Sequence, residues 1–395
     1  KSTNRIFSAF AQDTWRLTER LRLNLGLRWD GQRILDSNGE VGLSILDQWQ
    51  PRMGFTYQVG PLGVRKFFGN YGRFYQEVGS PVANYFVPGG NSVFAVYDQD
   101  PRVDPSDPIF LDEQTGSIGD PIEGIDGQYY DEFTLGYEQA LGGSSKILVR
   151  GTYRTMGKGV EDAYVDDSEY VIGNPGFGRL AEFPKIEREY QALELTFKTR
   201  PSPRTGVFAT YVLSRNRGNY SGLLSTTYGS PFPNRTEDFD ILATTINSNG
   251  LMTNDRPHVL KIYGWYTTGF GLTFGATGSW MSGTPLSEYA QLQTAAGLRL
   301  AYVSTRGDAG RTPSVYDLSL RFAYELPFRS GDTDARLILD LLHVGNPREA
   351  VRFDQLHYLG YDEEGNPAYP NPNYGVANYW QPPMMVRLCL LYTSP

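Results

Sequence analysis

The chain has 395 residues, a formal net charge of -8 and a pI near 5.1. This acidic balance without a basic run argues against a nucleic-acid partner, which requires clustered Lys and Arg side chains. The single cysteine, Cys389, rules out a disulfide framework and a cysteine-based zinc site. No stretch approaches the ~20 apolar residues that a membrane-spanning helix needs.

Taken in chain order, the sequence repeats one unit, which is a pair of alternating strands joined by a short link. The clearest strand is 21–33 (LRLNLGLRWDGQR). From Leu21 to Asp30 its Leu and Trp residues alternate with Arg, Asn, Gly and Asp, so that one face of this stretch is wholly apolar. We expect about thirteen such strands, at residues 5–16, 21–33, 52–59, 66–76, 132–141, 146–155, 189–199, 206–214, 258–267, 272–281, 315–326, 336–344 and 384–392.

Short links and long loops take turns between these strands. The links include 17–20, GPLG at 60–63 and TGFG at 268–271, whereas the longest loop ends near residue 130. In outer-membrane barrels the short turns are periplasmic, the long loops lie outside, and strands of ~10 residues cross an apolar band about 25 Å tall. The alternation therefore predicts an all-β, antiparallel transmembrane barrel whose apolar side chains meet lipid.

A soluble β-sandwich, propeller or adhesin is the alternative, because its strands also alternate. The expected strands are longer than the usual 5 or 6 residues, and compact domains rarely carry such long loops. Aromatic residues near strand ends further favour the membrane barrel, where they form interfacial girdles. The expected girdle residues are Trp15, Trp29, Tyr75, Tyr137, Tyr153, Trp265, Trp280 and Tyr392.

The direction of the strands gives a parity argument. The first strand precedes a short turn and the last follows a long loop, so both run towards the periplasm. A complete bacterial barrel has an even number of strands, whereas thirteen is odd. We therefore expect at least one upstream strand to be missing, and residues 1–395 to be the C-terminal part of a larger barrel.

Several segments carry a resemblance to a known family. The segment FSAFAQDTWRLTERLRLNLGLRWD (7–30) resembles the barrel signature of TonB-dependent outer-membrane receptors. QPRMGFTYQV, GNYGRFYQ, DEFTLGYEQAL, ILVRGTYR, NDRPHVLKIYGWY and SGTPL are similar to the Oar-like subgroup, whose full proteins carry an N-terminal carboxypeptidase-regulatory-like domain. The resemblance implies a barrel of about 22 strands with a plugged lumen, of which this chain holds strands ten to twenty-two. The family's plug domain and energy-coupling box have no counterpart in the sequence.

The end of the chain departs from the family pattern. Members usually finish on an aromatic residue that the barrel-assembly machinery reads, whereas this chain ends in CLLYTSP (389–395). We interpret these residues as non-native, because they resemble a translated sequencing adapter. The alternative is an unusual strand with Cys389 facing the lumen.

The sequence holds little that suggests catalysis. The histidines are His258, His343 and His357, and HExxH, P-loop, GxSxG and dinucleotide-binding motifs are absent. His258 follows a proline at the start of a strand, so we expect a structural role. The expectation is a protein without enzymatic activity and without a cofactor.

Two acidic loops are candidate sites for a hard cation such as calcium, although neither has the EF-hand spacing. The first contains Asp98, Asp100, Asp104, Asp107 and Asp112, and the second contains Glu161, Asp162, Asp166, Asp167 and Glu169. Solvated outer loops are the expected role, with calcium or lipopolysaccharide-bridging sites as the alternative.

Aromatic loop residues are the stronger candidates for ligand contact, because exposed aromatic side chains on loops often bind. They are Tyr85, Phe86, Phe94, Tyr97, Phe232, Tyr289 and Tyr302. Packing of the loops onto one another is an equally open role. Charged residues that face a lumen must be solvated or paired, here with a plug. The expected lumen-facing residues are Arg22, Arg28, Asp30, Arg150, Glu194 and Arg321.

Together, the pattern and the resemblance predict the ligand-binding and translocation barrel of an energy-coupled transporter for a large or scarce nutrient. Its place is the outer membrane of a Gram-negative bacterium. The resemblance implies as partners membrane lipid and lipopolysaccharide, the plug domain, a TonB-type coupling protein and the barrel-assembly machinery. The alternatives are a surface receptor or adhesin without uptake, a passive porin with an open lumen and, last, a soluble enzyme.

Overall fold

The computed structural model describes residues 3–36, 39–80, 82, 92–100, 102, 109–114, 122, 124–165, 169–225, 233–234, 236–294, 297–326 and 334–393. Long strands dominate this part of the chain. They are β1 (Thr3–Arg16), β2 (Leu21–Leu35), β3 (Val41–Val59), β4 (Arg65–Gln76), β7 (Gln128–Ala140), β8 (Ser145–Lys158), β11 (Arg188–Ser202), β12 (Thr205–Gly218), β14 (His258–Thr267), β15 (Leu272–Met281), β18 (Val315–Glu325), β19 (Asp334–Leu342) and β24 (Met385–Thr393).

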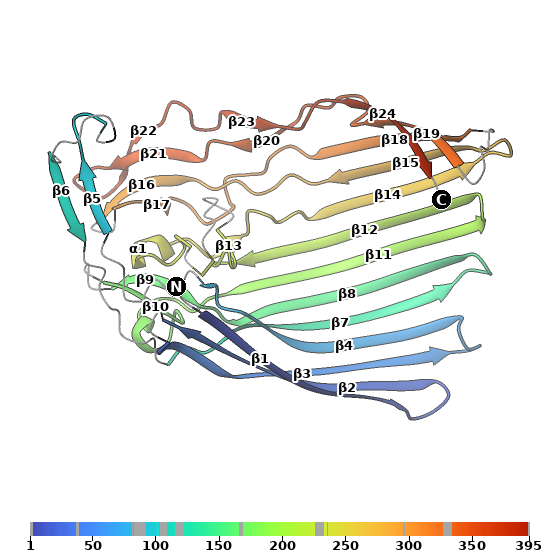
Figure 1. Ribbon diagram of the computed structural model, residues 1–395, viewed down its shortest axis with the longest axis horizontal. Coiled ribbons are helices and arrows are strands. Elements are labelled where there is room, and N and C mark those ends of the chain that lie inside the picture. Colours follow the sequence, from blue (N-terminus) through green and yellow to red (C-terminus); the bar gives the residue numbers. More distant parts are fainter. Residues whose placement is uncertain are drawn as a thin grey trace.

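These strands form one antiparallel sheet in the order of the chain, β1-β2-β3-β4-β7-β8-β11-β12-β14-β15-β18-β19-β24, and the short β13 (Gly250–Leu251) attaches to β12. The wall strands lie side by side as a curved surface that does not close on itself (Figure 1). Within the described part of the chain the predicted set of thirteen wall strands is confirmed, and so is the antiparallel barrel class. The structure is a partial barrel.

Register fixes which side chains share a face, because residues directly opposite one another in an antiparallel pair point the same way. What we call the apolar face holds the row Leu25, Met53, Tyr71, Phe133 and Tyr153, each opposite the next. What we call the polar face holds the row Asn24, Gly54, Asn70, Thr134 and Thr152. The leucine alternation of β2 therefore extends across the neighbouring strands.

Among the described residues, none forms a second layer over the apolar face. Leu135 is 62% exposed, Leu193 is 51% exposed and Phe133 is 49% exposed. In a soluble sandwich such side chains would lie between two sheets and form the core. Their exposure contradicts the soluble alternative and agrees with a face that meets hydrocarbon.

The long connections, which the sequence predicts as loops, carry secondary structure of their own. Residues 34–48 extend β2 to Leu35 and begin β3 at Val41, so the two strands form a long hairpin. The other elements are β5 (Ser92–Val96), β6 (Phe110–Gln114), β9 (Glu161–Val165), β10 (Glu169–Gly173), β16 (Tyr289–Thr294), β17 (Gly297–Tyr302), β20 (Ala350–Phe353), β21 (Leu356–Tyr361), β22 (Pro367–Pro370), β23 (Ala377–Trp380), α1 (Leu242–Thr245) and a 3-10 turn at Gly178–Leu180.

Buried hydrophobic clusters lie at the long-loop end of the sheet. One contains Ile34, Leu43, Ile45, Val78, Val82, Ile125, Val160 and Ile172, and the other contains Met156, Ala163, Val171, Leu180, Phe183, Ile186, Tyr220 and Phe239. We call the described residues of 159–187, 219–252 and 297–307 the cap. In Figure 1 its elements β9, β10, α1 and β17 gather at one end of the wall strands.

Within the described residues, no helix has the length and apolar character needed to cross a membrane.

Candidate functional site

The polar face carries a series of ion pairs. Arg28 Nη2 lies 2.8 Å from Asp30, and Arg150 Nη2 lies 2.7 Å from Glu194 on the neighbouring strand. Register places all the residues predicted to face a lumen on this one face, namely Arg22, Arg28, Asp30, Arg150, Glu194 and Arg321. That the face lines a lumen stays a prediction.

The densest charge cluster on this face joins three strands. Asp340 on β19 accepts hydrogen bonds from Arg321 Nε at 2.6 Å and from Arg387 Nη2 at 2.6 Å. The Asp340 side chain is only 4% exposed, whereas those of Arg321 and Arg387 are 53% and 56% exposed. Two guanidinium groups around one carboxylate leave this part of the polar face positively charged.

Aromatic rings on the apolar face pair across neighbouring strands. Between β4 and β7 these are Phe67 with Tyr137 at 4.9 Å, Tyr71 with Phe133 at 4.7 Å and Tyr75 with Tyr129 at 5.3 Å between ring centroids. The register places every predicted girdle residue except Trp265 on this face. Trp265 lies opposite Gly206 and Gly275 on the polar face, so its assignment to a girdle is wrong.

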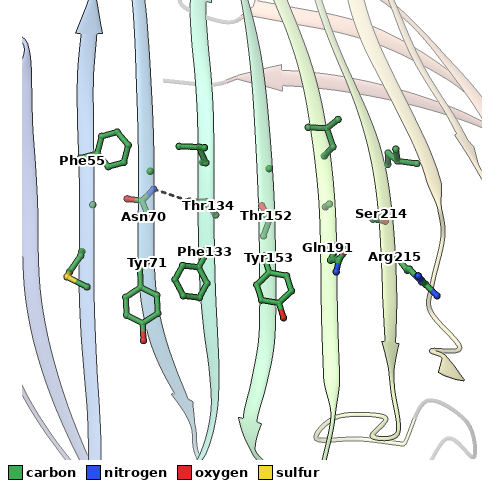
Figure 2. A pocket seen from close by; sticks show the side chains of 18 of the residues that line it. Phe55, Asn70, Tyr71, Phe133, Thr134, Thr152, Tyr153, Gln191, Ser214 and Arg215 are labelled. Carbon is green, nitrogen blue, oxygen red and sulfur yellow. Dashed lines mark hydrogen bonds between the residues drawn. The ribbon is translucent and has the colours of Figure 1, made fainter. Parts of the chain in front are cut away.

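A shallow depression of about 1000 Å³ crosses the apolar face from β2 to β12 (Figure 2). The row of Tyr71, Phe133 and Tyr153 borders it and ends in Gln191 and Arg215, which Figure 2 shows on β11 and β12. The adjoining row contains Gly151, where no side chain fills the surface, and Gly69, over which the Phe55 ring lies. The hollow is therefore apolar over most of its length and polar at one end.

The cap contains a buried polar network that the sequence reading missed. Glu161 and Asp162, expected in a solvated loop, are 0% and 4% exposed, so that expectation is wrong for these two residues. The backbone N–H of Thr236 donates to Glu161 at 2.9 Å, and the buried Arg306 guanidinium lies 3.4 Å from Asp238. These contacts tie the β9 hairpin to the segments around residues 236 and 306.

Burial sets the protonation of the cap carboxyl groups. It raises the pKa of Glu161 well above its usual range, and repulsion from Asp162 and Asp238 adds to the effect. Burial and the nearby Asp162 raise the pKa of Asp240 to about 7, although the ion pair with Arg299 opposes this. At neutral pH Asp240 is therefore partly protonated, and burial favours the protonated form of Glu161.

The predicted ligand-contact aromatics fall into three groups. Tyr85, Phe86 and Phe232 lie outside the described residues, and Phe94 lies in β5, but its side chain is outside the described part of the structure. Tyr97 follows β5 and is half-buried. Tyr289 and Tyr302 are 3% and 5% exposed, and their ring centroids are 5.0 Å apart. These two rings pair within the β16–β17 hairpin, where they are buried. Ligand contact by this set, and packing of the loops onto one another, both stay predictions.

Within the described part of the chain, no group of three or more His, Cys, Asp or Glu side chains has an arrangement suited to a metal ion. A cation site in the two acidic loops stays a prediction, because most of the acidic side chains in these loops fall outside that part. Asp100 pairs with Arg102 at 2.7 Å, and Asp98 is exposed. Asp104, Asp107, Asp166 and Asp167 lie outside the described residues, and the Asp112 and Glu169 side chains are not described.

Two further sequence expectations concern single residues. His258 Nδ1 lies 2.7 Å from the Tyr211 hydroxyl on the apolar face, a contact that suits the predicted structural role. Cys389 lies in β24 opposite Ile338, on the polar face beside Arg387. Its position matches the alternative of a strand residue facing a lumen, whereas the non-native origin of residues 389–395 stays a prediction.

An open antiparallel wall with one uncovered apolar face and one charged face defines a class, the β-barrels of the outer membrane. Residues 1–107 match the family described as TonB dependent receptor-like, beta-barrel. TonB-dependent receptors belong to the Gram-negative outer membrane, work with a plug domain and TonB, and comprise transporters and receptors. The predicted relationship of this chain to TonB-dependent receptors is confirmed.

The chain is 28% identical over 404 residues to the TonB-dependent transporter Oar of Myxococcus xanthus. The aligned region covers 91% of this chain and 37% of Oar. Similar solved structures include the FrpB iron transporter from Neisseria meningitidis (TM-score 0.57, 10% identity, 99% of this chain and 46% of that chain). Another is the ferripyoverdine receptor of the outer membrane of Pseudomonas aeruginosa, with a TM-score of 0.54 and 11% identity. The match covers 93% of this chain and 37% of that receptor chain. The chain therefore spans less than half the length of these relatives.

Proposed function

We propose that this chain is part of the ligand-binding and translocation barrel of an energy-coupled transporter in the outer membrane of a Gram-negative bacterium. The observation that carries the proposal is the pair of opposite sheet faces. Leu135 and Leu193 project from the apolar face and are more than half exposed, while Arg150 and Glu194 pair on the other face. A barrel wall between lipid and a wet lumen accounts for both faces at once.

The proposed mechanism needs no bond chemistry. The outer loops and the cap capture a large or scarce nutrient, and a plug domain inside the barrel then rearranges when a TonB-type protein pulls on it from the periplasm. The ion pairs on the polar face of the wall form the surface that the plug contacts, and the charges of this surface are already paired within the wall. The buried network of the cap holds the outer loops in one arrangement, which lowers the entropy lost when a ligand binds.

The full-length protein distinguishes this proposal from its alternatives. We expect it to fractionate with the outer membrane, to migrate faster in gels before heating than after, and to bind the purified periplasmic domain of a TonB protein. Liposomes that contain it should swell slowly in raffinose, because a plug blocks the lumen.

Three results would contradict the transporter proposal. Rapid swelling of the liposomes would indicate a passive porin. Slow swelling without binding to the TonB domain would indicate a receptor or adhesin without uptake. A water-soluble protein that does not fractionate with membranes would remove the barrel itself.

A further inference from the structure

Two histidines attach the last long connection of the chain to its neighbours. We call this connection, residues 343–384 between β19 and β24, the final loop; it carries β20, β21, β22 and β23. His343 is its first residue and His357 lies in β21. Each imidazole contacts a carboxylate from another part of the chain, which is Asp317 on β18 for His343 and Glu288, just before β16, for His357. The final loop is therefore joined to the wall at one point and to the preceding long connection at another.

The contacts of His343 require a charged imidazole ring. Its Nδ1 lies 2.6 Å from Asp317 Oδ1, and its Nε2 lies 2.8 Å from the carbonyl oxygen of Pro347. A carboxylate oxygen and a carbonyl oxygen can only accept, so both ring nitrogens must donate, which only the imidazolium form can do. Loss of the proton would set a nitrogen lone pair against one of these oxygens. His343 is only 5% exposed, so water does not readily replace the lost hydrogen bond.

The same ring holds the turn that begins the final loop. His343 has a φ of 58°, a left-handed conformation that is uncommon for residues other than glycine. Its backbone N–H donates to Ser319 Oγ at 3.4 Å, and the next N–H, of Val344, donates to the Leu318 carbonyl oxygen at 2.7 Å. The bond from the imidazole to Pro347 closes this turn from the other side. Protonation of His343 therefore supports a turn that the backbone alone disfavours.

His357 closes the second joint of the final loop. Its Nδ1 contacts Glu288 Oε1, and its ring stacks on those of Tyr358 and Tyr374, with 4.0 Å between ring centroids in both cases. A carboxylate and aromatic faces both favour a cationic ring over a neutral one. The backbone also joins the two connections here, because β16 pairs with β21 in parallel. The charged side-chain contact adds to this short ladder.

Few titratable groups surround the two rings. Among the described residues, those in contact with them are Asp317 at His343, and Glu288, Tyr358 and Tyr374 at His357. Asp340, three residues before His343 on β19, already forms ion pairs with Arg321 and Arg387. The carboxylates that contact the histidines therefore set the charge around each ring.

The direction of the pH effect follows from these partners. The hydrogen bond to Asp317, and then that to the Pro347 carbonyl, raise the pKa of His343 above its ordinary value of 6.5. A pKa that is higher in the folded state means that the protonated ring stabilises the attached loop. That stabilisation is complete below pH 6.5 and is lost as the pH rises through the higher folded-state pKa.

We infer that His343 and His357 form a pH-sensitive latch, which holds the final loop in place when both rings are charged and releases it as the pH rises. The inference goes beyond the proposed function, because the contacts that carry it do not depend on what the barrel transports. In the proposed barrel the long connections lie outside the cell, so the pH of the surroundings sets the state of the latch. A released loop must be ordered again when a ligand binds, which lowers the affinity at high pH.

The test measures hydrogen exchange of the final loop in the full-length protein at pH 5.5, 7 and 8.5, as protection factors corrected for the intrinsic exchange rate at each pH. The protein carries Asp240→Asn, which removes the separate titration of the cap. We expect the protection of amides in β20, β21 and β23 to fall about tenfold from pH 5.5 to pH 8.5, which corresponds to about 1.4 kcal/mol. Amides in the middle of the wall strands should keep their protection.

Substitutions separate the latch from a purely structural role. His343→Asn/His357→Phe keeps a donor that tolerates positive φ and an aromatic ring, but neither residue titrates, so the protection should be equal at the three pH values. His258→Phe is the matched control, because this histidine contacts the Tyr211 hydroxyl on the wall, and it should keep the tenfold fall. Asp317→Asn removes the carboxylate but leaves the ring, so the midpoint of the fall should move to lower pH.

Protection of the final loop that is independent of pH in the Asp240→Asn protein would overturn the inference. So would a fall that persists in His343→Asn/His357→Phe, or one that His258→Phe abolishes. If the double variant fails to assemble, Asp317→Asn decides alone, and an unmoved midpoint in that variant would contradict the latch. Heat-modifiable migration of each variant separates these outcomes from failure of the barrel proposal, because an intact barrel with an unmoved pH profile contradicts the latch alone.

Discussion

The most decisive perturbation of the wall is a charge on its apolar face at mid-height. Leu135 on β7 is 62% exposed and stands between Gly69 and Gly151 in the register. It lies five residues before the end of its strand at Ala140, so with tilted strands it is about 13 Å above the short-link end. That height is close to the middle of an apolar band about 25 Å tall.

The surrounding medium decides the effect of Leu135→Arg. In water, replacing so exposed a side chain changes the free energy of unfolding by no more than about 0.5 kcal/mol. At the centre of a bilayer the same change costs about 2–4 kcal/mol, which lowers the folding equilibrium constant roughly 30-fold to 800-fold. Thr134→Arg, one residue earlier on the polar face, is the matched control and should cost less than about 1 kcal/mol.

The assay is unfolding of the full-length protein in lipid vesicles by urea, followed by tryptophan fluorescence and by the fraction that keeps heat-modifiable migration. We expect the unfolding midpoint of Leu135→Arg to fall well below that of the unchanged protein, while Thr134→Arg stays near it. Equal midpoints for the two variants would refute the assignment of the apolar face to lipid.

Three further predictions concern the ion pairs and the cap. Asp340→Ala leaves two guanidinium groups facing each other and should destabilise the wall by about 1–3 kcal/mol in the same urea assay, whereas Glu325→Gln, from an exposed pair, should cost less than about 1 kcal/mol. The folded-state pKa of Asp240, about 7, lies above its ordinary value of 3.8, so the folded cap favours the protonated acid. The contribution of Asp240 to cap stability should be complete below pH 4 and fall by up to about 4 kcal/mol as the pH rises through 7. Cap amides should therefore have lower hydrogen-exchange protection factors, corrected for the intrinsic exchange rate at each pH, at pH 8.5 than at pH 5.5, and this difference should be absent in Asp240→Asn. Gly250→Ala places a Cβ 1.9 Å from the Arg306 carbonyl oxygen and should make the cap sensitive to protease while the wall keeps its heat-modifiable migration.

The wall was predictable because its signal is local. In β2 the alternation of Leu with polar residues predicts both the strand and its two faces. A shift of the strand register by one residue would move every polar side chain to the apolar face. Short links then dictate antiparallel neighbours. The set of thirteen wall strands follows from these two facts alone, without any knowledge of long-range contacts.

Trp265 shows where the same signal fails. In β14 (HVLKIYGWYT) both faces carry large apolar residues, with Leu260 and Ile262 on one face and Tyr263 and Trp265 on the other. Alternation cannot separate the faces of such a strand. The glycine opposite, Gly206, is the feature that makes an inward tryptophan possible, and its position is visible only in the register.

The cap was unpredictable for a different reason. Glu161 and Asp162 are buried, and Glu161 accepts a hydrogen bond from Thr236, 75 residues along the chain. No sequence pattern announces such a contact. Acidic residues between strands usually mean a solvated loop. Here tertiary contacts override that tendency, so the buried network had to be found in the structure.

The most direct test of the lipid-facing wall is the environment of Thr134 and Leu135, neighbours on opposite faces of β7. Each is replaced by a spin-labelled cysteine in the full-length protein, with Cys389 changed to Ser, and its collisions with oxygen and with a water-soluble nickel complex are measured in vesicles. The account predicts that the label at 135 meets oxygen and is shielded from nickel, while the label at 134 shows the reverse preference or is shielded from both. Equal access of nickel to both labels, or a label at 135 shielded from both reagents, would contradict it.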